Sequence, residues 1–282
     1  MKQILVPTDF SVQAEAALSL AAEMAKANSA ELTVLHVVEI PNHQSFSTTG
    51  TVAYGGDPME GVWIKKMIEK GERQLANVAA SPMMEGVNVK TKIRAGNAYY
   101  NMSDIIAEQM PDLIVMGTSG ATGAEEILIG SNTEKVVRNS KVPVLSVKKK
   151  MKLSDFNNIL LASEMKNEGI ELVRELKIIV KHANAKMHLL RVNTPNNFEG
   201  SAHTMKRMKA YVEKNGLDAE QHIYNSTTEE EGIMEFATSN HIDLIAMGTH
   251  GRKGLMHLLS GSIAEDVVNH SEIPVLTFKL ED

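Results

Sequence analysis

The chain has 282 residues, which at roughly 100–200 residues per domain suggests two domains. Its formal net charge is −6 and neither half is basic, which argues against nucleic acid or an anionic membrane as the main partner. It contains no cysteine, which excludes disulfides, thiol catalysis and cysteine-ligated zinc. No apolar run approaches the roughly 20 residues of a membrane span, and the first apolar run is too short for a signal peptide. We therefore expect a cytoplasmic protein.

The first half of the chain alternates short apolar runs with segments of helical periodicity. Its expected strands are Gln3–Val6, Glu31–Val38, Val87–Arg94, Leu113–Met116 and Val144–Val147. Its expected helices are Gln13–Ala27, with Ser11 as N-cap, and segments over about Met59–Ala80, Met102–Met110 and Asn132–Asn139. A loop rich in Ser, Thr and Gly is expected over about residues 41–57. This order predicts a parallel sheet with helices on both faces.

The second half repeats the first. The segment Asp112–Thr118 reads DLIVMGT and returns as Asp243–Thr249, which reads DLIAMGT. The strands expected here are Ile159–Ala162, Lys186–Val192, Gln221–Tyr224, Leu244–Met247 and Val275–Phe278. A repeat this long indicates duplicated domains rather than a solenoid of short units. We predict an α/β fold of two tandem Rossmann-like domains, residues 1–150 and 151–282, each with a five-stranded parallel sheet and helices on both faces.

A glycine-rich loop follows the fourth strand of each half. The first loop has Gly117, Gly120 and, after nine residues, Gly130-Ser131. The second has Gly248, Gly251, Gly261 and Ser262 at the same spacing. Glycines let backbone N–H groups approach an anion, and the start of the next helix offers free N–H groups and the positive end of its dipole. Each loop therefore has the form of a phosphate cradle, and Ser131 and Ser262, each followed three residues later by Glu, fit helix capping boxes.

The fifth strand of each half begins just after a proline, Pro143 or Pro274. Proline cannot donate a hydrogen bond to a strand ladder, so it favours a strand start or a sheet edge, and an apolar edge must be covered. We predict that each fifth strand lies at a sheet edge that another strand must cover. Pairing of whole chains into a homodimer stays open.

Together these motifs resemble the universal stress protein family, in its ATP-binding branch. The resemblance rests on the spacing of the glycine loop, on Pro7-Thr8-Asp9-Phe10-Ser11 at the start and on Val142-Pro143-Val144-Leu145 at the end, and it covers nearly the whole chain. It implies that Asp9, within Pro7-Thr8-Asp9, lies by adenosine and that the backbone of Val37 contacts adenine. It implies a phosphate site at Gly117, Gly120, Gly130 and Ser131, flanked by Met116 and Asn132. The implied ligand is ATP, with AMP or ADP as alternatives and Mg²⁺ left open. In single-domain members of the family the last strand resembles the dimer contact, and here the partner strand lies in the same chain. The resemblance therefore implies that the two halves pack about a pseudo-two-fold axis with their fifth strands adjacent and antiparallel.

The second half departs from this pattern at its first strand. Ala162-Ser163-Glu164 replaces Pro7-Thr8-Asp9, and Arg191 replaces His36. The glycine loop is intact, but the residues at the positions that the resemblance places beside adenosine are changed. Whether the second half binds the same nucleotide stays open.

The sequence favours binding over catalysis. It contains no nucleophile–base set, no tight histidine spacing for a metal, and no Gly-Lys-Ser/Thr to stabilise phosphoryl transfer. We expect no catalytic residues and no metal site, although slow ATP hydrolysis is compatible with such a protein. The preferred function is a nucleotide-binding regulatory protein of the stress response. The alternative is a scaffold without a nucleotide, or a binder of another small ligand, that acts through protein partners the sequence does not identify.

Overall fold

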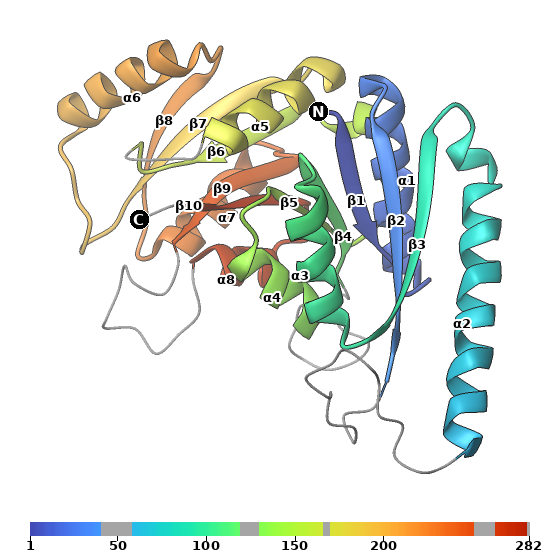
Figure 1. Ribbon diagram of the computed structural model, residues 1–282. Coiled ribbons are helices and arrows are strands. Elements are labelled where there is room, and N and C mark those ends of the chain that lie inside the picture. The colour runs from blue at the N-terminus through green and yellow to red at the C-terminus, as the bar shows by residue number, and fades with distance from the viewer. Residues whose placement is uncertain (41–57, 119–129, 166–169, 251–262, 281–282) are drawn as a thin grey trace.

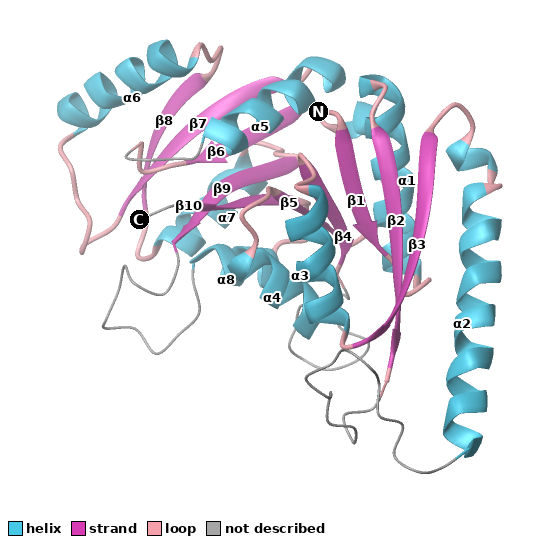
Figure 2. Ribbon diagram, viewed as in Figure 1, coloured by secondary structure: helices cyan, strands magenta, loops and turns pink. Residues whose placement is uncertain are grey.

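A computed structural model describes residues 1–40, 58–118, 130–165, 170–250 and 263–280 (Figures 1 and 2). In the first half the strands are β1 (Gln3–Pro7), β2 (Glu31–Glu39), β3 (Asn88–Gly96), β4 (Leu113–Gly117) and β5 (Val144–Val147). In the second half they are β6 (Asn158–Ala162), β7 (Lys186–Asn193), β8 (Glu220–Asn225), β9 (Leu244–His250) and β10 (Val275–Leu280). The helices are α1 (Val12–Asn28), α2 (Pro58–Ala79), α3 (Ala98–Gln109), α4 (Ser131–Asn139), α5 (Ile170–Ala183), α6 (Ser201–Asn215), α7 (Glu229–Ser239) and α8 (Ile263–His270). The loop expected over residues 41–57 lies outside the described residues.

The ten strands form one continuous sheet, in the order β3-β2-β1-β4-β5-β10-β9-β6-β7-β8. Within each half all strands are parallel, as predicted, and the only antiparallel pair among these ten strands joins β5 to β10. The register there places Leu145 opposite Leu276, and the hydroxyls of Ser146 and Thr277 donate to Val275 O at 3.0 Å and Val144 O at 3.3 Å. The predicted meeting of the two fifth strands is confirmed.

Helices cover both faces of the sheet, and a core that runs through both halves lies under each layer (Figure 2). One core gathers side chains of α1, α5 and α6, among them Leu20, Leu176 and Met208. The other gathers side chains of α3, α4, α7 and α8, among them Ile105 and Val267. No described helix is both long enough and apolar enough to cross a membrane. Because each core spans both halves, the halves are packed as one body rather than as beads on a linker.

Two helix starts test the predicted caps. Ser11 caps α1 as expected, since its hydroxyl accepts a hydrogen bond from Ala14 N at 3.2 Å. The prediction that Ser131 caps α4 is wrong, because Ser131 is the first helical residue and Gly130, which has no side chain, is the N-cap. The Glu134 carboxylate that would complete the box turns forward instead, to Arg138 at 3.0 Å. In the second copy, Ser262 lies outside the described residues.

Candidate functional site

The carboxyl ends of the parallel strands of the first half meet at one edge of the sheet (Figure 1). The chain runs outward from β1 to β2 and β3, then crosses back to β4 on the other side of β1. Ligands of doubly wound α/β folds bind outside the strand ends at such a reversal point. The structure brings the predicted residues of β1, β2, β4 and α4 to this edge: Pro7, Thr8, Asp9, Val37, Met116, Gly117, Gly130, Ser131 and Asn132. Gly120 lies outside the described residues.

The end of β1 is held by β2. Thr8 N donates to Leu35 O at 2.8 Å, and the ring Nδ1 of His36 lies 2.8 Å from Thr8 O. The chain then leaves the sheet in a turn in which Asp9 Oδ1 accepts a hydrogen bond from Ser11 N at 2.9 Å. Thr8 is buried whereas Asp9 is exposed. Asp9 therefore presents a carboxylate to solvent beside the start of α1, while His36 packs and hydrogen-bonds as a structural neighbour.

Val37 lies on β2 just beyond the last pairing with β1. The β1–β2 register ends at Pro7 and Leu35, and the Leu35 carbonyl accepts the final hydrogen bond from that side. Backbone carbonyls alternate along a strand, so the backbone groups of Val37 face the same side as the Leu35 carbonyl. They therefore point into the space past the end of β1. This is the position from which a strand backbone can bind the edge of a planar base.

Gly117 ends β4 against the first turn of α1. A Cβ atom placed on Gly117 would lie 2.5 Å from Gln13 O and 2.6 Å from Ala14 N, closer than such contacts occur in proteins. The Gly117 carbonyl also accepts a hydrogen bond from the hydroxyl of Thr133 at 3.3 Å, which fixes α4 to the same strand. Packing alone therefore requires glycine here, whatever the site binds.

The first turn of α4 closes the far side of the candidate site. Ser131 is exposed, and the Asn132 side chain donates to Glu39 Oε1 at 3.4 Å, which ties the start of α4 to the end of β2. The free N–H groups of the first helical turn and the helix dipole favour an anion at this end. Sequence reasoning missed Glu39, which lies one residue past the strand predicted to end at Val38. The signal in the sequence that could have found Glu39 is an acidic residue at the carboxyl end of a predicted strand.

In the second half a polar network occupies the corresponding edge. Arg191 is 4% exposed, and its guanidinium lies 3.5 Å from Glu164 Oε1 and donates to Asn197 O at 3.1 Å. Asn197 in turn donates to the same Glu164 oxygen at 2.8 Å, and Arg207 donates to the Glu164 backbone carbonyl. The carboxylate that replaces Asp9 is thus bound by the protein's own side chains.

The glycine loop of the second half is described only in part. Gly248 lies within β9, where a Cβ atom would come within 2.8 Å of the flexible side chain of Leu280. The strand continues to His250, three residues past its predicted end at Met247. Gly251, Gly261 and Ser262 lie outside the described residues. Among the described residues of this edge, the two halves therefore differ where Glu164 and its hydrogen-bond partners replace the exposed Asp9.

Comparison with known proteins decides the family. The model of the Universal stress protein family matches the chain twice, over residues 1–148 and 155–279. The chain belongs to the universal stress protein family. Both halves are copies of its domain, so this is a tandem universal stress protein.

Some similar proteins match the whole chain and others match about half of it. Universal stress protein Slr1230 of Synechocystis sp. is 25% identical over a match that covers 99% of this chain and 100% of the relative. Universal stress protein MJ0577 of Methanocaldococcus jannaschii is 34% identical over 155 residues, which cover 53% of this chain and 96% of the relative. A crystal structure of a universal stress protein from Archaeoglobus fulgidus has a TM-score of 0.76 at 24% identity and covers 98% of both chains, which supports the fold.

Proposed function

We propose that this universal stress protein binds an adenine nucleotide, ATP or alternatively AMP or ADP, at the carboxyl edge of the first half's sheet. Its role would be regulatory, within the stress response, and not that of an efficient enzyme. The observation that carries the proposal is the convergence at one strand reversal of three elements: the exposed Asp9, the outward-facing backbone of Val37 and the first turn of α4.

The three elements suit the three parts of such a ligand. The strand backbone at Val37 offers a donor and an acceptor to a base edge, and the Asp9 carboxylate can accept hydrogen bonds from ribose hydroxyls. The N-terminus of α4 favours the negative phosphates. Nothing in this set is a positioned nucleophile or base, so the proposal is one of binding, with ATP turnover well below a typical enzyme rate of about 10 per second.

The second half is proposed to bind nucleotide weakly or not at all. Asp9 is exposed, whereas its counterpart Glu164 is bound by Arg191 and Asn197. A ligand would have to displace these hydrogen bonds, and a buried Arg191 left without its carboxylate is costly. We therefore propose one nucleotide per chain.

Titration calorimetry of the full chain with ATP, AMP and GTP tests this proposal. We expect one adenine-nucleotide site per chain with a dissociation constant in the micromolar range, about −8 kcal/mol. Asp9→Ala should weaken ATP binding at least about tenfold, roughly 1.4 kcal/mol, while the matched change Glu164→Ala in the second half should leave it unchanged. Absence of heat with every adenine nucleotide would refute the function, and equal losses in the two variants would refute the assignment to the first half.

A further inference from the structure

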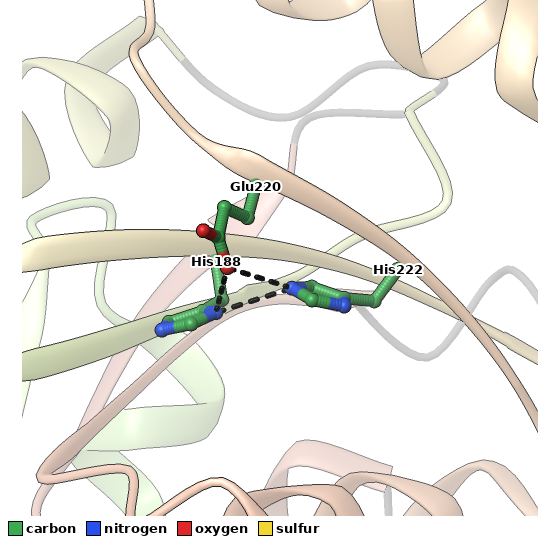
Figure 3. Close-up of side chains that lie close together, drawn as sticks. All are labelled: His188, Glu220 and His222. Carbon is green, nitrogen blue, oxygen red and sulfur yellow. Dashed lines mark hydrogen bonds and ion pairs between the residues drawn. The ribbon is translucent and has the colours of Figure 1, made fainter.

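Two histidines and a glutamate from neighbouring strands gather on one face of the sheet in the second half (Figure 3). His188 lies on β7, and Glu220 and His222 lie on the edge strand β8. The register pairs His188 with Glu220, and His222, two residues further along, returns to the same face. His188 Nδ1 lies 3.1 Å from His222 Nε2, and Glu220 Oε2 lies 3.7 Å and 3.8 Å from these two nitrogens.

These separations match those of ligands around one small metal ion. A tetrahedral Zn²⁺ holds nitrogen and oxygen ligands at about 2.0–2.1 Å, which places the ligand atoms about 3.3 Å from one another. Two imidazoles and one carboxylate are a common ligand set for such ions. We propose that His188, His222 and Glu220 bind a divalent transition metal ion of the Zn²⁺ class, with solvent completing the coordination.

The hydrogen bonding around His188 prepares it as a ligand. The Asn158 amide donates through Nδ2 to His241 O at 3.3 Å, which turns its Oδ1 toward His188 Nε2, 3.3 Å away. Because this oxygen can only accept, Nε2 carries the ring proton and Nδ1 points a lone pair at His222 and Glu220. Histidine ligands of metals are typically oriented by such a bond from the other ring nitrogen.

Burial and access also suit a metal ion. His188 is 5% exposed, and the Phe236 ring of α7 packs 4.9 Å from the His222 ring. Burial is the largest cause that lowers the pKa of His188 and of His222. The Glu220 side chain is 51% exposed and provides the way in from solvent.

Lys186 is the one neighbouring charge that opposes a cation here, among the groups that the structure places beside the three ligands. Its ammonium lies 2.7 Å from Glu220 Oε1 and so neutralises one carboxylate oxygen, while Oε2 faces the histidines. Removing this positive charge should strengthen metal binding. Such a gain in metal affinity is opposite in sign to the loss of affinity expected if the substitution damaged the pairing of β7 with β8.

The first half shows that the fold does not require this cluster. The strand registers place Thr33, Lys90 and Lys92 at the positions of His188, Glu220 and His222. The same sheet therefore forms with no metal ligand there. The cluster also lies near the amino ends of β7 and β8, away from the carboxyl edge proposed for the nucleotide. The metal site thus belongs to the second half and is independent of the nucleotide proposal.

Titration of the chelator-treated full chain with Zn²⁺ tests the proposal, by calorimetry and by thermal unfolding. His222→Gln and Glu220→Gln should each remove one equivalent of bound Zn²⁺, with an affinity loss greater than the roughly 10- to 100-fold that follows loss of a ligand's hydrogen-bond partner. Lys186→Met should bind Zn²⁺ several-fold more tightly. His182→Gln, which changes an exposed histidine on α5, is the matched control and should bind as the unmodified chain does.

Mg²⁺ serves as the second control, because it prefers oxygen ligands and should not bind at this site. His222 and Glu220 are partly or well exposed, so their variants should fold, and circular dichroism checks that they do. Bound Co²⁺ in place of Zn²⁺ should give the intense visible absorption of four-coordinate geometry. If Zn²⁺ stoichiometry and affinity are the same in the unmodified chain, His222→Gln and Glu220→Gln, the cluster is only a hydrogen-bonded histidine pair and the proposal is wrong.

Discussion

At the scale of single residues, Gly117 is a position that the packing of the fold itself restricts to glycine. Its α-hydrogen faces the Gln13 and Ala14 backbone at a distance that leaves no room for a methyl group. We expect Gly117→Ala to destabilise the ligand-free protein by about 1–3 kcal/mol, because α1 must move away from β4. Urea unfolding measures this, with Gly61→Ala as the control.

Gly61 lies in α2, and a Cβ atom there meets nothing within 4 Å. Alanine should therefore be neutral or stabilising at Gly61, by up to about 1 kcal/mol, through helix propensity. Equal effects at the two positions would contradict the packing argument for Gly117. A stability loss at Gly117 would also mean that a weaker nucleotide affinity in this variant is no proof of a phosphate contact.

The repeated aspartates Asp112 and Asp243 are a second case. The Asp112 carboxylate accepts hydrogen bonds from Lys2 N at 2.5 Å and Gln3 N at 3.1 Å, at the start of β1. Asp243 binds the start of β6 in the same way, through the N–H groups of Asn157 and Asn158. The aspartate in the DLI motif is thus shared by the two halves because it joins two strand starts, away from the candidate site.

The pKa of Asp112 gives this role a pH dependence. Partial burial alone would raise that pKa, but the backbone hydrogen bonds and the charge of Arg174 outweigh it and lower the pKa below 3.8. A lowered folded-state pKa stabilises the fold above the unfolded value of about 3.9, and the contribution is lost as pH falls through the folded value. Asp112→Asn should cost about 1 kcal/mol at pH 7 and progressively less on acidification below pH 4.

Urea unfolding at several pH values measures this difference, with Asp104→Asn on the exposed side of α3 as the control. The control should show little effect at any pH. A constant gap between Asp112→Asn and the unmodified chain down to acid pH would rule out the proposed hydrogen-bonded carboxylate.

At the scale of elements, α4 and α8 carry an ion pair between the halves. Arg138 Nε donates to Glu265 Oε1 at 2.7 Å, its terminal nitrogen also contacts Glu265, and the Glu265 side chain is 5% exposed. Arg138→Met should destabilise the protein by about 2 kcal/mol, because it leaves a buried carboxylate without its guanidinium. Arg138→Met combined with Glu265→Gln should cost less than the sum of the single changes.

Chemical denaturation of the four proteins in this double-mutant cycle measures the coupling. Additive effects would show that the pair does not join the halves energetically. The pair is asymmetric, since the position equivalent to Arg138 in the second half is Asn269, whose backbone carbonyl accepts a hydrogen bond from Lys148 at 2.6 Å. The pseudo-two-fold axis therefore relates the helices but not their side-chain partners.

The strands and the helix order could be predicted from the sequence, because apolar runs, prolines and an internal repeat are local or self-comparing signals. The β5–β10 pairing could be predicted only with the resemblance to the family, whose single-domain members pair through this strand. The capping of α4 could not be predicted from the sequence, since it depends on whether the Glu134 side chain turns back to the helix start or forward to Arg138. The candidate metal cluster could not either. His188 and His222 lie 34 residues apart and meet only through strand register. The network that binds Glu164 likewise comes from a distant segment around Asn197.

At the scale of the whole molecule, the ten-stranded sheet and its two continuous cores should keep the halves together without a covalent link. Lys149 and Lys150 in the connection are exposed. A protease site inserted after Lys150 and then cut should give two fragments that co-elute in size-exclusion chromatography. Val275→Lys, which places a charge on a 1% exposed position of the β5–β10 pair, should make the cut fragments separate or aggregate. Separation of the cut fragments that lack the Val275→Lys change would contradict the shared core.

The β5–β10 pairing within one chain also has a consequence for how the two halves can change. In a pair of identical chains, every substitution appears in both partners, so neither can lose a binding site while the other keeps it. Here each molecule carries one copy of each half at a fixed ratio of one to one. The second half can therefore carry Glu164, Arg191 and a histidine cluster while the first carries Asp9. Because the two halves are joined in one chain, they can differ in their side chains, and every molecule still contains one of each.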